Sequence, residues 1–266
     1  MNVVGLVMAG GRGERARRSI ADISKPLLEV GGVTLIERNL LALVEAGFRK
    51  LVVSVSAADS ALSSFVADRC GTLVGSWGGS LELLAERWPR GNIGCAAELR
   101  GRGATVLVVF ADNLTSMSLH SIVRSHVEHD ADLTLATHRE AIPIPYGEVR
   151  VRQGRVTEYS EKPVHRVLIC SGIAVLGERA LAAIPADEAM GISQLARKLI
   201  DQGALVREYR HSASWVDVND AASLSRAELL FSRSQREFTP PSNDPRADRS
   251  RPLVEAGAPH TSRRPG

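Results

Sequence analysis

The chain is poor in the features that mark several large classes of protein. It has three cysteines in 266 residues, and aromatic residues make up 4% of it. Cys70, Cys95 and Cys170 lie far apart and form neither a Cys-x-x-Cys pair nor a zinc spacing, so neither a disulfide framework nor a structural zinc site is predicted. We expect reduced thiols, which are typical of cytoplasmic proteins.

Long apolar runs are also missing. The run from Val3 to Met8 is too short to cross a membrane, and it has neither the charged leader nor the cleavage site of a signal peptide. A net charge of +3 with few aromatic residues does not supply the broad basic surface of a nucleic-acid-binding protein. We therefore expect a cytoplasmic protein with neither a membrane segment nor a nucleic-acid partner.

What the sequence does contain is an alternation of strand-like and helix-like segments. With 44% hydrophobic residues, the chain can form one large α/β core. Apolar runs alternate with amphipathic patterns at residues 3–8, 35–46, 50–56, 60–69, 105–111, 118–129 and 132–137. This order predicts a mostly parallel sheet with helices on both faces.

The pattern changes after residue 137. Segments 148–152 and 155–159 flank Gln153-Gly154 and predict a hairpin, which a strand at 167–175 follows. Antiparallel additions of this kind often form an extension on the substrate side.

Three further elements complete a predicted domain at residues 1–232. They are helices at 193–202 and 221–232 and a strand at 205–209. Residues 233–266 are rich in Ser, Arg, Pro and Asp, and we expect them to form a disordered tail.

The most specific feature is a glycine-rich loop directly after the first strand. Ala9-Gly10-Gly11-Arg12-Gly13-Glu14-Arg15 is followed one loop later by Lys25-Pro26-Leu27-Leu28. Glycines let backbone N–H groups converge on an anion, and Arg15 and Lys25 add the positive charge that a polyphosphate needs. The expected ligand is a nucleoside triphosphate.

Two better-known phosphate loops fit less well. The dinucleotide fingerprint needs an acidic residue at the tip of the second strand, which here ends in Ser54-Val55-Ser56. A P-loop needs its lysine directly after the last glycine, whereas Lys25 is far from Gly13. A Rossmann oxidoreductase is therefore disfavoured.

These residues resemble the signature of the sugar-phosphate nucleotidyltransferases, a family that includes mannose-1-phosphate guanylyltransferases and glucose-1-phosphate thymidylyl- and adenylyltransferases. The similarity covers residues 1–231. It implies a Rossmann-like, mostly parallel mixed sheet flanked by helices, of the nucleotide-diphospho-sugar transferase type, with a small antiparallel extension on the sugar side. The nucleotide-binding residues that it implies are Ala9, Gly10, Gly11, Gly13, Arg15, Lys25, Gly91 and Gly94. The sequence departs from the family at Arg18, Ser24 and Asn92, where the family usually has two prolines and a threonine.

Two aspartates are the candidate metal ligands. Asp112 follows the apolar residues 106–111, at the carboxyl end of a predicted strand, where open α/β sheets bind their ligands. Trp215-Val216-Asp217-Val218-Asn219 resembles the family segment whose aspartate joins the first in holding magnesium. Carboxylate oxygens suit Mg²⁺, which phosphate and water oxygens then complete. Asp220 is more plausible as the cap of the following helix.

The resemblance also implies a sugar-phosphate site. The residues that it assigns there are Gly147, Glu161, Lys162 and Ser171. Cys170 and Ala174 replace the family's asparagine and tyrosine, which makes mannose or glucose less secure as the sugar. His126 and His129 share a helix face without a zinc-protease pattern, and we expect both to face solvent.

The function predicted is transfer of a nucleotide from a nucleoside triphosphate to a sugar 1-phosphate, with Mg²⁺ as cofactor and pyrophosphate as the second product. Arg15, Lys25 and Lys162 would be the catalytic residues. GTP is favoured, because the segment at Asp217 resembles the guanylyltransferase branch, with dTTP and ATP close behind. Two alternatives stay open: a non-sugar nucleotidyltransferase, and a catalytically silent regulatory paralogue that binds nucleotide. Members of the family often self-associate, so a homo-oligomer is a further expectation.

Overall fold

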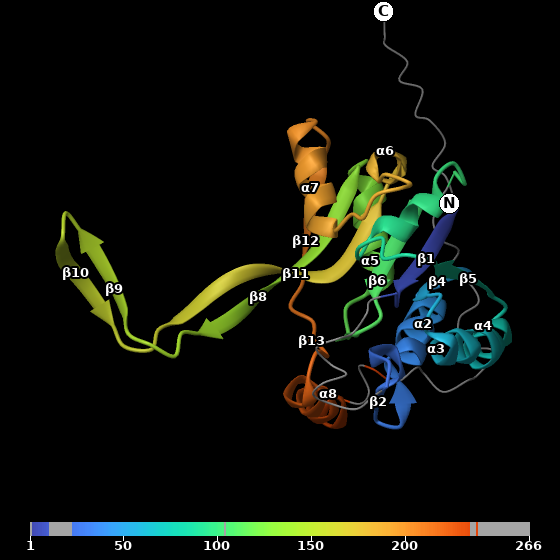
Figure 1. The fold of residues 1–266 in the computed structure, drawn as a ribbon, viewed down its shortest axis with the longest axis horizontal. Coiled ribbons are helices and arrows are strands. Elements are labelled where there is room, and N and C mark those ends of the chain that lie inside the picture. Colours follow the sequence, from blue (N-terminus) through green and yellow to red (C-terminus); the bar gives the residue numbers. More distant parts are fainter. Residues whose placement is uncertain (1, 11–22, 104, 235–237, 239–266) are drawn as a thin grey trace, which may run out of the picture.

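The computed structural model describes residues 2–10, 23–103, 105–234 and 238. Its centre is a seven-stranded sheet in the order β12-β8-β11-β6-β1-β4-β5 (Figure 1). Neighbouring strands run parallel, except that β11 is antiparallel to both β6 and β8. The predicted mixed, mostly parallel sheet is therefore confirmed. Its strands are β1 (Val3–Met8), β4 (Lys50–Ser56), β5 (Ser80–Glu86), β6 (Thr105–Phe110), β8 (Leu133–Pro143), β11 (Val164–Leu176) and β12 (Val206–Arg210).

Three two-stranded sheets and a set of helices surround the central sheet. The small sheets pair β2 (Glu29–Val30) with β3 (Val33–Thr34), β7 (Asn113–Thr115) with β13 (Trp215–Asp217), and β9 (Glu148–Arg152) with β10 (Arg155–Ser160). The helices are η1 (Lys25–Leu27), α2 (Leu35–Glu45), α3 (Ser60–Phe65), the π-helical turn η2 (Val66–Cys70), α4 (Gly71–Ser76), η3 (Gly94–Leu99), α5 (Leu119–Glu128), α6 (Glu178–Ala183), α7 (Ile192–Asp201) and α8 (Ala221–Arg233). No helix in the described ranges is long and apolar enough to span a membrane.

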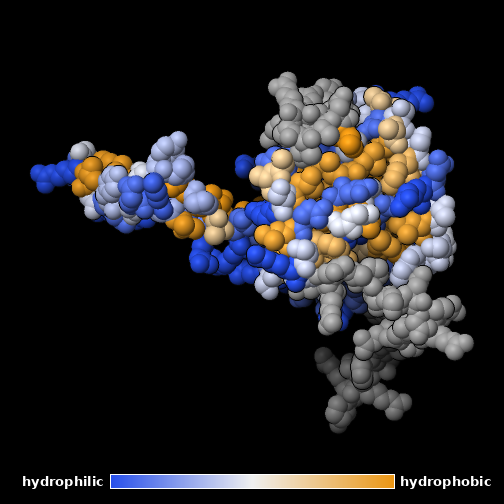
Figure 2. All heavy atoms as spheres, turned by 90° about the horizontal axis from the view of Figure 1, so that it is seen from below, coloured by the Kyte–Doolittle hydropathy of each residue, from blue (hydrophilic) through white to orange (hydrophobic). Residues whose placement is uncertain are grey.

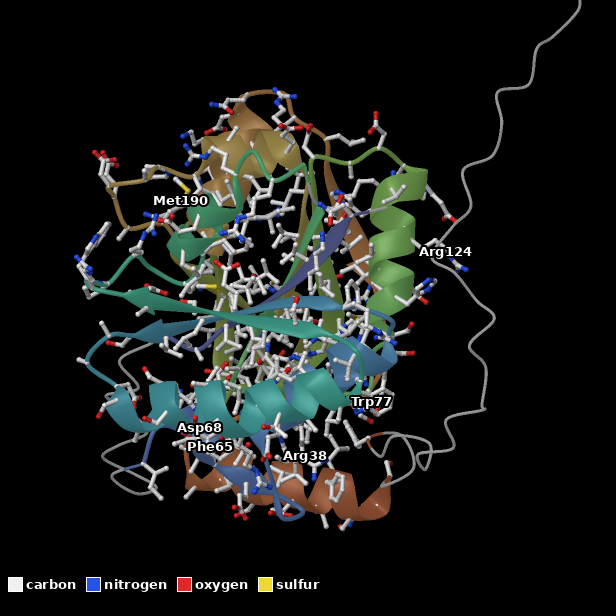
Figure 3. All side chains as sticks on the ribbon, turned by 90° about the vertical axis from the view of Figure 1, so that its right-hand side faces the viewer. Arg38, Phe65, Asp68, Trp77, Arg124 and Met190 are labelled. Carbon is white, nitrogen blue, oxygen red and sulfur yellow. The ribbon has the colours of Figure 1, made fainter. Side chains whose placement is uncertain are left out.

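Strand β1 shows why the sheet is covered on both faces. Its side chains alternate: Val3 and Val7 join the core beneath α2, α3, α4 and α5, while Val4, Leu6 and Met8 join the core beneath η3, α6 and α7. Figure 3 shows Phe65 and Asp68 on one side of the strands and Met190 on the other. A strand that is apolar at every position thus has both faces buried.

A third, smaller core holds the segment that carries Lys25. Helix α8 packs Ala227 and Phe231 against Leu28 and Val30 near η1, and against Val216 of β13. The predicted domain boundary at residue 232 falls one residue before the end of α8. Of the predicted tail, Arg233 ends α8, Ser234 caps it, and Phe238 packs on Phe231 with ring centroids 6.2 Å apart; its other residues lie outside the described ranges.

The antiparallel extension is an arm that leaves the body of the molecule. Strands β8 and β11 stay paired from Thr137↔Cys170 to Pro143↔Val164, and the β9–β10 hairpin continues outward from their ends. Figures 1 and 2 show this arm projecting from one side of the sheet. The hairpin predicted around Gln153-Gly154 is confirmed.

Several local predictions are corrected by the structure. The helix predicted at 60–69 continues as η2 and α4 to Ser76, and the strand β5 was not predicted. His126 does not face solvent: it is 4% exposed, and its Nδ1 lies 2.9 Å from Thr134 Oγ1. Burial lowers the pKa of His126, so a neutral ring packs in the core. Asp220 caps α8 as predicted, since its carboxylate accepts the N–H of Ser223 at 2.7 Å.

Candidate active site

Two backbone segments that are far apart in sequence bring Asp112 and Asp217 together. Asp112 lies between β6 and β7, and β7 pairs with β13 in the register Asn113↔Asp217. The N–H of Val218 donates to the carbonyl of Asp112 at 2.9 Å. Both predicted metal ligands therefore stand at the carboxyl end of β6, the edge at which parallel sheets bind ligands.

Lys25 links the two aspartates. Its Nζ lies 3.7 Å from Asp112 Oδ2 and donates a hydrogen bond to Asn219 Oδ1. The amide of Asn219 in turn donates to Asp217 Oδ2. Lys25, Asp112, Asn219 and Asp217, named here the lysine–aspartate cluster, are thus joined by one ion pair and two hydrogen bonds.

Buried amides fix the backbone beneath this cluster. Asn39 of α2 donates from Nδ2 to the carbonyls of Ala111 (3.3 Å) and Asn113 (3.1 Å). Asn113 donates from its own Nδ2 to the carbonyl of Ser171 at 3.0 Å. Because both amides are buried and paired, they hold the end of β6 in one geometry.

The electrostatics of the cluster favour a bound cation. Burial, and then the nearby charge of Asp217, raise the pKa of Asp112, while Lys25 opposes the rise. Two carboxylates face one ammonium, and Asp217 Oδ1 is buried without a hydrogen-bond partner in the described structure. An orphaned carboxylate oxygen is costly unless an ion satisfies it. These two acids fit Mg²⁺, which binds few protein ligands and keeps waters and phosphate oxygens.

Only the beginning of the predicted glycine loop can be described. Gly11, Gly13 and Arg15 lie outside the described residues. The N–H of Ala9 donates to the carbonyl of Ser54 at 2.8 Å, so this N–H extends the hydrogen bonding between β1 and β4. At Gly10, an added Cβ would stand 2.6 Å from Glu86 Oε1 and 3.3 Å from Ser54 Oγ. Glycine at position 10 therefore leaves room for a buried carboxylate.

The segment with Gly91 and Gly94 forms a braced turn before η3. Gly91 has φ +78°, and a Cβ there would lie 2.4 Å from the carbonyl of Met190. Ile93 N–H donates to that carbonyl at 3.2 Å, and Asn92 Oδ1 accepts the N–H of Ile192 at 2.9 Å. The side chain of Asn92, where the family has threonine, thus ties this turn to the start of α7.

The predicted sugar-side residues lie on the arm, away from the lysine–aspartate cluster. Glu161 and Lys162 sit between β10 and β11, and Gly147 sits just before β9 (Figure 1). Tyr159 connects two of them: its hydroxyl donates to Glu161 Oε2 at 3.2 Å and lies over Gly147. The structure therefore groups Gly147 with Glu161, which precedes Lys162 in the chain, but does not bring them to Lys25 or Asp112.

Ser171 lies at the root of the arm, in the interior. It is 0% exposed, and its hydroxyl stands 2.8 Å from both His138 Nδ1 and His211 Nε2. Its carbonyl accepts from Asn113 Nδ2 and, at 2.8 Å, from Trp215 Nε1. With its hydroxyl and its carbonyl both engaged, Ser171 joins the arm to β7 and β13 rather than offering a free hydroxyl.

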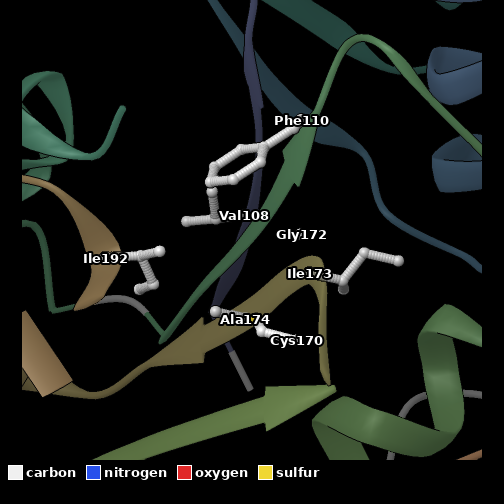
Figure 4. Close-up of a pocket in the computed structure, with 7 residues that line it drawn as sticks. All are labelled: Val108, Phe110, Cys170, Gly172, Ile173, Ala174 and Ile192. Carbon is white, nitrogen blue, oxygen red and sulfur yellow. The ribbon is translucent and has the colours of Figure 1, made fainter. Parts of the chain in front are cut away.

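A hollow with an apolar lining separates β6 from the bulge of β11 (Figure 4). It is lined by Val108, Phe110, Cys170, Gly172, Ile173, Ala174 and Ile192. Cys170 and Ala174 are the positions where the family has asparagine and tyrosine, so these two replacements make the wall next to β6 less polar.

Two residues beyond the predicted set contact residues of the candidate site. Asn219 bridges Lys25 and Asp217, although its sequence motif alone gave it no role. Glu86 ends β5 and accepts a hydrogen bond from Ser54 beneath Gly10. A carboxylate at the carboxyl end of a parallel strand is the signal that marked Asp112, and it would have marked Glu86 had β5 been predicted.

Comparison with known proteins settles the family. The nucleotidyl transferase family model matches residues 4–233, most of the chain. The chain belongs to this family. The predicted membership among the sugar-phosphate nucleotidyltransferases is thereby confirmed.

Similar proteins include two glucose-1-phosphate adenylyltransferases. The one from Nitrosospira multiformis is 27% identical over 61% of this chain and 42% of its own length, and the one from Rhodococcus erythropolis is 28% identical over 62% and 44%. The chain thus spans less than half the length of these relatives.

Solved structures confirm the fold of this nucleotidyl transferase. A Bacillus anthracis structure described as a glucose-1-phosphate thymidylyltransferase, in complex with sucrose, has a TM-score of 0.67, 19% identity, and covers 86% of this chain and 94% of its own. HddC from Yersinia pseudotuberculosis, complexed with GMP-PN, has a TM-score of 0.63 and 19% identity over 87% of this chain and 100% of its own.

Proposed function

We propose that this nucleotidyl transferase condenses a nucleoside triphosphate with a sugar 1-phosphate to give an NDP-sugar and pyrophosphate. The observation that carries the proposal is the lysine–aspartate cluster, in which the carboxylates of Asp112 and Asp217 and the ammonium of Lys25 meet at the carboxyl end of β6. This arrangement suits a polyphosphate with its metal ion, and the named activities of the relatives support it.

The reaction is an in-line substitution at the α-phosphorus. An oxygen of the sugar 1-phosphate forms a new P–O bond, and the bond from the α-phosphorus to the bridging oxygen of pyrophosphate breaks. Lys25, already aimed between Asp112 and Asn219, would offset negative charge that develops on the transferring group. Arg15 and the glycines at 10, 11 and 13 would hold the triphosphate, as the family resemblance implies.

Asp112 and Asp217 would hold Mg²⁺. Bound there, the ion would neutralise phosphate charge and polarise the α-phosphate. The chain's own contribution is to orient the two carboxylates: Lys25 pairs with Asp112, and Asn219 donates a hydrogen bond to Asp217. Mg²⁺ as the cofactor stays part of the proposal, as does the cytoplasm, where nucleoside triphosphates are abundant.

On the acceptor side, Lys162 would orient the nucleophilic phosphate, and Glu161 with the backbone of Gly147 would contact sugar hydroxyls. These roles come from the family resemblance. Cys170 and Ala174 beside the apolar hollow support an acceptor less richly hydrogen-bonded than mannose or glucose.

GTP is the proposed nucleotide. The carboxylate of Glu86 is buried beside Gly10 and can only accept hydrogen bonds while it is ionised. Guanine carries two adjacent donors, N1–H and N2–H, on its Watson–Crick edge, whereas adenine and thymine alternate donors with acceptors there. Glu86 therefore supports guanine over the other two bases, in line with the resemblance of the Asp217 segment to guanylyltransferases.

The test is Mg²⁺-dependent pyrophosphate release over a matrix of nucleoside triphosphates and sugar 1-phosphates, with Asp112→Asn as the blank. We expect release with GTP and one sugar phosphate, and a loss of the preference for GTP in Glu86→Gln. If pyrophosphate is released with ATP or dTTP but not with GTP, the guanine assignment is refuted. If none of the sugar 1-phosphates supports release with any nucleotide, the proposed reaction is refuted.

A further inference from the structure

The arm has one apolar and one charged face. In the register of β9 with β10, Val151 opposes Val156 and Val149 opposes Tyr159, so these four side chains share a face. The opposite face is charged. It carries Glu148, Arg150, Arg152, Arg155 and Glu158, with Arg150 and Glu158 in an ion pair of 3.3 Å. An amphipathic hairpin of this kind is patterned to be covered on one side.

No described part of the chain covers that apolar face. Nine of the fourteen exposed large apolar side chains in the described residues lie between Ile142 and Leu168. Val151 is 59% and Val156 is 63% exposed, and Figure 2 shows hydrophobic surface along the arm. A contiguous exposed apolar patch marks an interaction site. A two-stranded hairpin is also only marginally stable without a packing partner.

Strand pairing and hydrogen bonds at the root hold the arm away from the body of its own chain. The β8–β11 ladder is unbroken from Thr137↔Cys170 to Pro143↔Val164, so the arm is a continuous ribbon. Its root is fixed by Ser171, which is hydrogen-bonded to β7, β13, His138 and His211. At Gly172, where the ladder is bulged, an added Cβ would lie 2.3 Å from Asn113 Nδ2, so the root of the arm packs closely against β7.

We propose that a second copy of this chain covers the arm, and that the arm of each copy completes the acceptor site of the other. The arm from Ile142 to Leu168 has 27 residues, nine of them exposed large apolar side chains, enough to form the apolar centre of an interface that has about 20–30 residues per side. An apolar face on identical arms is self-complementary, as a two-fold dimer requires. The second part rests on the proposed function: Lys162 and Glu161 are carried away from the lysine–aspartate cluster of their own chain, and a crossing arm delivers them to the partner's cluster.

The first test needs no substrate. Sedimentation of the full chain should give a species of twice the 28.6 kDa chain mass. Val151→Asp with Val156→Asp should raise the dimer dissociation constant by about a hundredfold, because it puts charge in the centre of the interface. Arg152→Asp, on the charged face, changes the net charge by the same amount and should leave dimerisation unchanged.

A milder variant separates loss of the interface from loss of the hairpin. Val149→Thr, Val151→Thr and Val156→Thr together keep β-branched side chains and should weaken the dimer while circular dichroism stays as in the wild type. A wild-type chain that sediments at the single-chain mass, or an Asp or Thr variant that dimerises like the wild type, would overturn the proposal.

The second test asks which chain supplies Lys162. Asp112→Asn and Lys162→Ala, each inactive alone, are mixed after dissociation. Random pairing makes half of the dimers mixed with one intact site of two, so about a quarter of wild-type activity should return. No recovery in mixtures shown to contain mixed dimers would refute the shared site, while an inactive wild-type dimer would instead refute the proposed reaction.

Discussion

The nucleotide side and the arm of this nucleotidyl transferase are built on opposite principles. At the lysine–aspartate cluster, Asp112 and Asp217 are fixed by strand pairing, and buried amides such as Asn39 hold the backbone behind them. On the arm, by contrast, Tyr159 and Glu161 contact each other in solvent, and the apolar side chains around them are exposed. The difference teaches that the single chain preorganises the half of the candidate site proposed for the triphosphate and metal, whereas the half proposed for the acceptor lies on an arm that the described chain leaves exposed.

The largest effect is expected from a substitution in the lysine–aspartate cluster, if the reaction takes place there. Asp112→Asn should lower kcat/KM for pyrophosphate release by about a thousandfold, because the amide cannot balance the charge of the metal ion. Steady-state pyrophosphate release with circular dichroism of the same samples checks this. Asp68→Asn, an exposed carboxylate on η2, should behave as the wild type. A variant that keeps near-normal turnover would remove Asp112 from the mechanism.

Asn219 tests whether preorganisation of the cluster matters beyond its charges. Asn219→Ala leaves both carboxylates in place but removes the bridge from Lys25 to Asp217. Losing such an outer contact should raise the Mg²⁺ concentration for half-maximal activity by about tenfold. The matched control is Asn92→Ala, which removes an equally specific amide contact, to the N–H of Ile192, that involves neither carboxylate. We expect it to cost stability and to leave the Mg²⁺ requirement unchanged; an equal shift in both variants would contradict the role of Asn219.

The same substitution in the two regions should have unequal effects. Gly10→Ala places a Cβ 2.6 Å from the buried carboxylate of Glu86, and should cost about 1–3 kcal/mol of unfolding free energy. Gly147→Ala places a Cβ 2.2 Å from the hydroxyl of Tyr159, but this ring is exposed and can rotate away, so the cost should stay within about 0.5 kcal/mol. Urea unfolding of both variants provides the measurement. Equal losses would mean that the arm is as rigidly packed as the core.

The contrast also explains what the sequence alone could predict. Asp112 was found because a β-branched, apolar strand delivers it to the sheet edge, and Asp217 because its segment resembles a family motif. Glu86 was missed because residues 80–86, Ser-Leu-Glu-Leu-Leu-Ala-Glu, favour a helix by local propensity, and only pairing with β4 makes them a strand.

Tertiary contacts account for the other differences. His126 was assigned to solvent because nothing in its helix reveals Thr134, which comes from the next strand. The hairpin of the arm was predictable from its turn, whereas its direction depends on the bulge at Gly172 and on the buried bonds of Ser171, which no local pattern encodes.

The smallest expected effect concerns the acidity of Asp112. Burial and Asp217 raise its pKa in the folded chain, so the native state binds this proton more tightly than the unfolded chain does. The resulting stability is present below the usual aspartate pKa of about 4 and is lost as the pH rises through the folded pKa. Asp112→Asn imitates the protonated acid. Its Tm should therefore match the wild type near pH 4 and exceed it by about 3 °C at pH 7. Mg²⁺ should close that gap by stabilising only the wild type, because a cation between the carboxylates removes the repulsion that raised the pKa; a gap that Mg²⁺ leaves open would show that the ion binds elsewhere.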